Sequence, residues 1–170
     1  MTAAWSNAAE SVSLGIVLAD FSLRNTGDAS VPVAVRQWGQ GRAHRDTLEE
    51  LILRTRDLHD QTTAVIWAVH FPPRPPGESG WMNLINGEEL LEAARASGVR
   101  HVLAGHIHRD FTYQSRDQRV SVLCANSACS CTLDEGNGFQ ILEIDVGDDY
   151  VRVVERGHIW DDDIGEFVAT

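Results

Sequence analysis

Two short apolar runs that each end in histidine constrain the fold of this chain most strongly. The run Ala64–Val69 precedes His70, and the run Arg100–Ala104 precedes Gly105-His106-Ile107-His108. Both runs are typical of buried β-strands, and open α/β sheets collect ligands at the carboxyl ends of their strands. Alternation along the backbone would send His106 and His108 to the same side, and the preceding glycine would allow a close approach or an unusual dihedral angle. The pattern therefore predicts a metal-binding edge on a sheet.

The remaining sequence predicts strands that alternate with helices and then give way to strands alone. The predicted strands are 11–18, 64–69, 100–104, 119–125, 138–146 and 150–155, and the predicted helices are 46–58 and 87–97. The apolar segment 31–35 contains Pro32, which limits it to an edge or an extended stretch. Gly147-Asp148-Asp149 predicts a turn that joins the last two strands into a hairpin. This order predicts an α/β fold with a mixed β-sheet and flanking helices.

Helix ends and the chain end carry their own signals. Asp46 and Glu49 form a candidate capping box for the first helix. Asn86 is a candidate N-cap for the second helix, and Gly98 is a candidate stop. The segment 158–170 is acidic, and we expect it to fray as a tail.

The two histidine motifs resemble a known family. Val69-His70-Phe71-Pro72-Pro73 and Gly105-His106-Ile107-His108 are similar to the last two metal-binding motifs of the calcineurin-like metallophosphoesterases. The resemblance runs from about residue 12 to about residue 154, and it includes Leu18–Ser22 and Ala125–Ala128. The two prolines, with the later Trp81-Met82, resemble the cyclic-nucleotide phosphodiesterase-like branch of that family.

Other motifs of the family are missing. Members begin with Asp-any-His, Gly-Asp-any-any-Asp and Gly-Asn-His-Asp, whereas here Gly27-Asp28 has Val31 at the second Asp position and Gly136-Asn137 is followed by Gly138. The resemblance therefore implies one partial domain over 1–170, equivalent to the second half of a four-layer α/β/β/α sandwich. No catalytic residue is assigned, because the motif with the general-acid histidine is absent.

The resemblance also implies ligand roles. His70 and His106 would hold one divalent metal, and His108 would help to hold the other. Imidazole nitrogen suits manganese, iron or zinc, and two such ions polarise a phosphoryl group and generate hydroxide. The plain alternative is that these histidines are polar residues at strand ends with ordinary hydrogen bonds. Whether this chain alone binds metal is a separate question, since three imidazoles split over two positions make a poor site.

Charged residues near the motifs provide further candidates. Asp110 could orient an imidazole through a hydrogen bond to the ring nitrogen that does not bind metal, or it could cap the turn. Arg109 and Arg74 could meet a substrate phosphate, although most arginines beside loops are solvated. Asp20 could approach the site, but a strand-end hydrogen bond is the better expectation.

Charge and composition limit the partners and the cellular location that we expect for this chain. The net charge is −11, which argues against a nucleic-acid partner but not against a small phosphate ester. The chain has no apolar stretch of about eighteen residues and no signal sequence at its amino terminus, so we expect a cytoplasmic protein without a membrane partner. The inner face of its sheet would lack a partner. We therefore expect a homo-oligomer, or pairing with a separately encoded amino-terminal half.

Three functions fit these observations. The first is a metal-dependent phosphoesterase acting on phosphate mono- or diesters. The second is a non-catalytic remnant that serves as a binding or self-association module. The third is a new metal site in which His70, His106 and His108 from two chains meet across a symmetric dimer.

Overall fold

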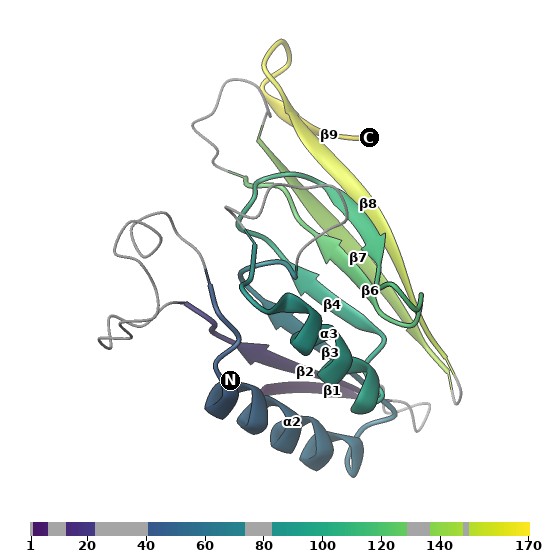
Figure 1. The fold of residues 1–170 in the computed structure, drawn as a ribbon. Coiled ribbons are helices and arrows are strands. Elements are labelled where there is room, and N and C mark those ends of the chain that lie inside the picture. Colours follow the sequence, from purple (N-terminus) through teal and green to yellow (C-terminus); the bar gives the residue numbers. More distant parts are fainter. Residues whose placement is uncertain (1, 7–12, 23–40, 74–82, 129–136, 148–149) are drawn as a thin grey trace.

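A six-stranded mixed sheet forms the centre of the fold (Figure 1). The computed structural model describes residues 2–6, 13–22, 41–73, 83–128, 137–147 and 150–170. The strands are β1 (Thr2–Ser6), β2 (Ser13–Ala19), β3 (Ala64–Val69), β4 (His101–Ala104), β5 (Phe111–Gln114) and β6 (Ser121–Cys124). Their order is β1-β2-β3-β4-β6-β5; the four central strands are parallel, and the edge strands β1 and β5 are antiparallel. This confirms the predicted mixed α/β fold.

Two helices cover one face of this sheet. They are α2 (Arg45–His59) and α3 (Gly87–Ala96), and both match the predicted helices to within one residue at each end. Helical spacing places Leu51, Thr55 and Leu58 of α2 in the core. Trp67 of β3 is fully buried on the same side, and its indole N–H donates to the Thr55 hydroxyl at 2.7 Å. In the described part of the chain, no helix is long and apolar enough to cross a membrane.

The helix ends differ from the predicted caps in detail. α2 begins after His44, so Asp46 lies within the first turn, and Glu49 forms a salt bridge with Arg45 at 2.8 Å. The predicted capping box is therefore wrong. The N-cap of α3 is Asn86 as predicted, but its side chain does not cap the helix.

The carboxyl end of α3 follows the prediction. Gly98 adopts a positive φ of 75°, and the backbone N–H of Val99 donates to the Ala94 carbonyl at 2.9 Å. The N–H of Gly98 donates to the Arg95 carbonyl at 3.1 Å, which completes a Schellman motif. A glycine is favoured at this position because other residues rarely adopt such a φ.

A second sheet of three antiparallel strands follows the first. Its strands are β7 (Gly138–Val146), β8 (Val151–Asp161) and β9 (Glu166–Ala169), and β7 and β8 form the predicted hairpin. The prediction that the acidic tail frays is wrong: Trp160 pairs with Phe167, and their rings lie 5.1 Å apart. Aromatic cross-strand contacts stabilise this end against the repulsion among its aspartates.

The second sheet packs on the face of the first sheet that is opposite the helices (Figure 1). The His101 ring on β4 hydrogen-bonds the Val151 carbonyl on β8 at 3.1 Å, and the Thr112 hydroxyl on β5 donates to Glu155 at 2.7 Å. The expectation that the inner face lacks a partner is therefore wrong at β4 and β5. At β2, Leu18 remains 46% exposed.

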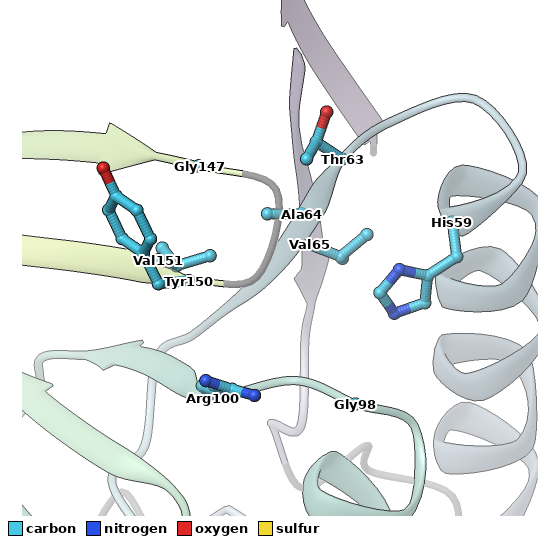
Figure 2. A pocket seen from close by; sticks show the side chains of 9 residues that line it. All are labelled: His59, Thr63, Ala64, Val65, Gly98, Arg100, Gly147, Tyr150 and Val151. Atoms are coloured by element: carbon cyan, nitrogen blue, oxygen red, sulfur yellow. The ribbon is translucent and has the colours of Figure 1, made fainter. Parts of the chain in front are cut away.

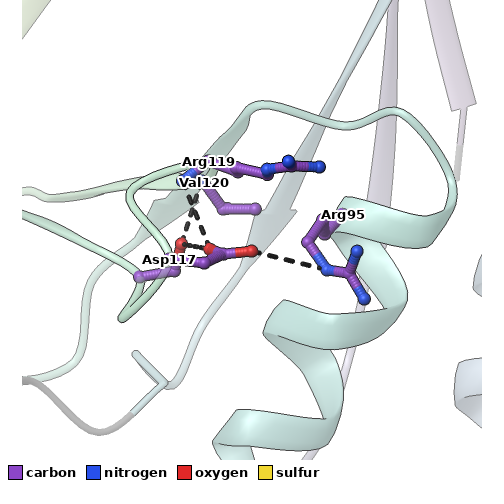
Figure 3. Close-up of polar contacts among 5 residues, drawn as sticks. Arg95, Asp117, Arg119 and Val120 are labelled. Carbon is purple, nitrogen blue, oxygen red and sulfur yellow. Dashed lines mark hydrogen bonds and ion pairs between the residues drawn. The ribbon is translucent and has the colours of Figure 1, made fainter.

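The turn between β5 and β6 is tied to α3 (Figure 3). Asp117 accepts a hydrogen bond from the Ser115 hydroxyl at 2.7 Å and one from the Arg119 backbone at 3.3 Å, and it lies 3.5 Å from Arg95. The Ser115 bond, the Arg119 backbone bond and the nearby guanidinium groups lower the pKa of Asp117. These contacts fix the outer end of β5, whose other end begins beside the histidine loop.

Replacing Thr55 with valine tests the packing of α2. The substitution keeps the shape of the side chain but leaves the buried Trp67 N–H without its acceptor. We expect a loss of about 1–3 kcal/mol in the free energy of unfolding, measured by urea denaturation. Thr47→Val, on the same helix but only partly buried, is the control. Equal losses in the two variants would contradict the role of the Trp67 hydrogen bond.

His101 makes the inter-sheet contact sensitive to acid. Burial lowers the pKa of His101 below its usual 6.5, and Arg100 adds to this, while the bond to Val151 and the charge of Glu155 oppose it. A lowered pKa means that the unfolded chain takes up the proton first, so stability falls as the pH drops through about 6.5. We expect the free energy of unfolding to fall more between about pH 7.5 and pH 5.5 in the native chain than in His101→Gln. Parallel pH profiles would refute this.

Candidate metal centre

The parallel pairing of β3 with β4 brings two predicted ligands together. His70 follows β3, and the Gly105 backbone N–H after β4 donates to the His70 carbonyl at 3.0 Å, which extends the ladder beyond both strands. As a result, Nδ1 of His106 lies 3.1 Å from Nε2 of His70. The predicted meeting of histidines from two strand ends is therefore found in the structure for this pair.

The loop that carries His106 does not follow strand alternation. β4 ends at Ala104, and His106 and His108 adopt positive φ values of 70° and 55°. Strand alternation, on which the sequence prediction relied, therefore does not orient these two imidazoles. Gly105 does not have a positive φ, and among the described residues a Cβ there would meet only the His70 carbonyl, at 4.0 Å. The unusual dihedral angles belong to the histidines themselves, where they cost about 1–2 kcal/mol each.

An aromatic ring completes the contact between the two histidines. Phe71 is only 5% exposed, and its ring lies 4.3 Å from the His106 ring and 4.8 Å from the His70 ring, centre to centre. The centres of the two imidazole rings are 4.9 Å apart. Sequence analysis gave Phe71 no role, although its position directly after a strand-end histidine was a usable signal.

A small set of backbone contacts holds the segment that follows His70. The Leu84 N–H donates to the Pro72 carbonyl at 2.8 Å, and the Ile85 N–H donates to the Gly41 carbonyl at 2.8 Å. The Tyr113 hydroxyl on β5 donates to the Pro73 carbonyl, and burial raises the pKa of Tyr113 above its ordinary value. Segments from four parts of the chain therefore fix the backbone beside the histidines.

Asn86 connects two of these segments. Its side-chain amide accepts from the Ala43 N–H at 3.2 Å and donates to the Ala43 carbonyl at 3.0 Å. The amide also donates to Glu89 at 3.0 Å. Asn86 has a positive φ of 58°, and its side chain binds Ala43 and the Glu89 side chain without capping the backbone of α3.

The other predicted site residues are not gathered at this pair. His108 is exposed, and within the described residues it makes no hydrogen bond or ring contact. The Asp110 carboxylate accepts a hydrogen bond from the Gln140 amide on β7, which also bonds Glu155 at 3.1 Å. Arg109 is exposed, and Arg74 lies outside the described residues.

A shallow pocket of about 430 Å³ borders His70 at the ends of β2 and β3. Its lining is Leu18, Ala19, Asp20, Ala68, Val69 and His70. Within it, Asp20 accepts hydrogen bonds from the backbone N–H of Ser22 at 2.8 Å and from the Ser22 hydroxyl at 2.5 Å. The expected strand-end role of Asp20 is therefore confirmed.

Another pocket, of about 240 Å³, lies at the opposite ends of β3 and β4 (Figure 2). His59, Arg100 and Tyr150 project around it. His59 Nε2 bonds the Ser97 carbonyl at 2.9 Å, and the Tyr150 hydroxyl donates to Asp145 at 3.3 Å. The His59 and Tyr150 side chains thus have structural partners, and the pocket is separate from the histidine pair.

The fit of the pair to a metal ion is partial. Two neutral imidazoles are good ligands for zinc, manganese or iron, and they stand close enough to share one ion. Among the residues that the structure describes, however, no group of three histidine, cysteine, aspartate or glutamate side chains could hold a metal. The described chain therefore provides two of the ligands that such an ion needs.

Comparison with known proteins identifies the fold. No family model and no curated protein matches the sequence. Among solved structures, a dimetal phosphatase from Danio rerio matches with a TM-score of 0.58 and 17% identity, over 92% of this chain and 57% of that protein. GAP50, the anchor in the inner membrane complex of Plasmodium, matches with a TM-score of 0.55 and 10% identity, over 99% of this chain and 51% of that protein.

This chain thus shares a mixed α/β fold with part of each of these two proteins. It spans about half the length of the two structures that it resembles. At these identities the likeness concerns the fold alone.

The strained histidine loop makes a prediction about stability. Replacing His108 with glycine removes the unfavourable φ but adds flexibility to the unfolded chain, so we expect a net gain of roughly 0.5–1 kcal/mol. Gly105→Ala should change the free energy of unfolding by less than about 0.5 kcal/mol, because its Cβ has room. Urea denaturation measures both values. A loss of stability in His108→Gly would show that its imidazole has a structural role.

Proposed function

We propose that this chain carries one metal-binding position of a metal-dependent phosphoesterase, with His70 and His106 as ligands of one divalent ion. The observation that carries the proposal is the 3.1 Å separation between Nε2 of His70 and Nδ1 of His106. The fold shared with a dimetal phosphatase supports it.

The separation suits two ligands of one ion. Nitrogen ligands about 2.0–2.1 Å from zinc lie roughly 2.9 Å apart at a right angle and roughly 3.4 Å apart at the tetrahedral angle. The observed 3.1 Å lies between these limits. The side chains would therefore need only small adjustments to accept an ion.

Proton placement sets the condition for binding. At 3.1 Å the two nitrogens share one proton, and one ring donates to the other. Both nitrogens must present lone pairs to a metal, so each imidazole must carry its single proton on the other nitrogen. Metal binding therefore requires that the proton between the two rings be moved or released.

The remaining parts of the proposed site come from outside the pair. His108 would contribute to a second metal position, and oxygen ligands would complete both coordination spheres. A bound ion would polarise the phosphoryl oxygen of a small phosphate mono- or diester and lower the pKa of a bound water. Asp110, held by Gln140, would keep the histidine loop in place, and Arg109 would face the phosphate.

A non-catalytic interaction module is the second candidate function. Two observations favour it: the described residues provide only two adjacent ligands, and Leu18 leaves an apolar surface beside them. GAP50, one of the structures that share this fold, is named as the anchor in the inner membrane complex of Plasmodium. In this case a second copy or a separate chain would cover the exposed end of the sheet.

Metal stoichiometry separates the two candidates. The purified chain is equilibrated with manganese or zinc, desalted and weighed by native mass spectrometry. We expect the native chain to retain metal, and we expect His70→Ala and His106→Ala to lose it. His59→Gln, which replaces an exposed imidazole in the distant pocket, is the matched control and should retain metal.

Retention of the same amount of metal in His106→Ala would contradict the proposal, since the ion would then lie elsewhere. A native chain that holds no metal, even as an oligomer, would favour the interaction module. Hydrolysis of bis(p-nitrophenyl) phosphate by the metal-loaded chain would then test the activity itself.

A further inference from the structure

We propose that Phe71 is a positioning residue, whose ring holds the His106 imidazole against His70. We also infer that residue 41 is glycine so that this ring has room. The inference rests on the proposed function for its consequence in metal binding, but its geometric part can be tested in the metal-free protein.

Three rings contact one another at this point. The Phe71 ring is tilted by 58° to the His106 ring at 4.3 Å and stands nearly perpendicular to the His70 ring, at 79° and 4.8 Å. The two imidazoles meet at 70°. Tilted and edge-on arrangements of this kind are favourable for aromatic pairs. Each ring therefore limits the rotation of the other two.

The Phe71 ring also lies close to backbone. A Cβ at Gly41 would overlap the Phe71 ring and would lie 2.8 Å from the Phe21 carbonyl oxygen. Gly41 cannot easily retreat, because its carbonyl accepts from Ile85 and it pairs with Ser22. The Phe71 ring is thus packed close to a fixed backbone as well as to the two imidazoles.

The loop that carries His106 does not by itself orient the imidazole ring. His106 lies beyond the end of β4 with a φ of 70°, so neither the pleat of the sheet nor the usual strand rotamers orient its ring. Gly105 anchors the backbone of the loop to His70 but has no side chain. Ring packing by Phe71 acts directly on the imidazole plane, together with the contact from His70.

Some groups contact a metal ligand on the side away from the ion and fix its orientation. Removing such a group typically lowers metal affinity by about 10- to 100-fold. We therefore expect Phe71→Met, which fills much of the same volume without a flat ring, to weaken cobalt binding by about that factor. Gly41→Ala displaces the ring instead of removing it and should act in the same direction.

Phe21→Met is the matched control. Phe21 is fully buried in the same core, and within the described residues it makes no ring contact with either histidine. The control therefore undergoes the same chemical change at an equally buried site. Circular dichroism of all three variants establishes that they are folded.

Two readouts are measured on each chain. Cobalt titration, followed by the visible ligand-field bands, gives the affinity and the coordination of the ion. Imidazole nitrogen shifts in NMR spectra of the metal-free chain show whether the hydrogen bond between His106 Nδ1 and His70 Nε2 is formed. We expect Phe71→Met and Gly41→Ala to lose that hydrogen bond signature and to bind cobalt more weakly, with Phe21→Met unchanged in both.

The readouts separate failure of the inference from failure of the proposed function. If Phe71→Met and Gly41→Ala keep the native imidazole shifts, Phe71 does not position the pair. If Phe21→Met loses the hydrogen-bond signature and the cobalt affinity as much as Phe71→Met and Gly41→Ala do, the effect is general destabilisation and the inference fails. If the native chain binds no cobalt, the proposed function fails, and the metal-free spectra still decide the role of Phe71.

Discussion

The hydrogen bond from the Gly105 N–H to the His70 carbonyl is the contact on which the candidate centre depends. It continues the parallel pairing of β3 and β4 for one step beyond the strands, to His70 and Gly105, and His106 is the next residue along the chain. Backbone pairing fixes the distance between neighbouring strands, so His106 begins close to His70. The pairing of central strands thus sets the spacing of the two ligands.

Close contacts hold the strained histidine loop in place. His106 and His108 adopt left-handed backbone conformations that other residue types, above all glycine, would adopt at lower cost. The surrounding contacts hold the loop in place: the Phe71 ring against His106, the Tyr113 hydroxyl on Pro73, and the Gln140 amide on Asp110. Strained residues held by well-determined surroundings are common at functional sites. His106 is held in this way, whereas His108 is exposed.

Much of the architecture could be predicted because its signals are local. Apolar runs marked β3 and β4, helical spacing marked α2 and α3, and Gly98 marked a helix end. The errors have physical reasons. β5 and β9 are four residues long and lack a clear pattern, and the aspartates near the end of the chain masked aromatic pairing across strands. The side chain of Asn86 binds Ala43, a partner 43 residues away, which no local rule anticipates.

The sequence by itself determined that histidines follow two strands of a mixed α/β sheet, because hydrophobic periodicity and residue order are written along the chain. It also determined the residue types that make metal chemistry possible. Only the tertiary structure decided which histidines meet. His70 and His106 come together through strand pairing and a buried phenylalanine, while His108 turns to solvent. That outcome depends on backbone dihedral angles and on contacts between distant segments, and these are set when the whole sheet assembles.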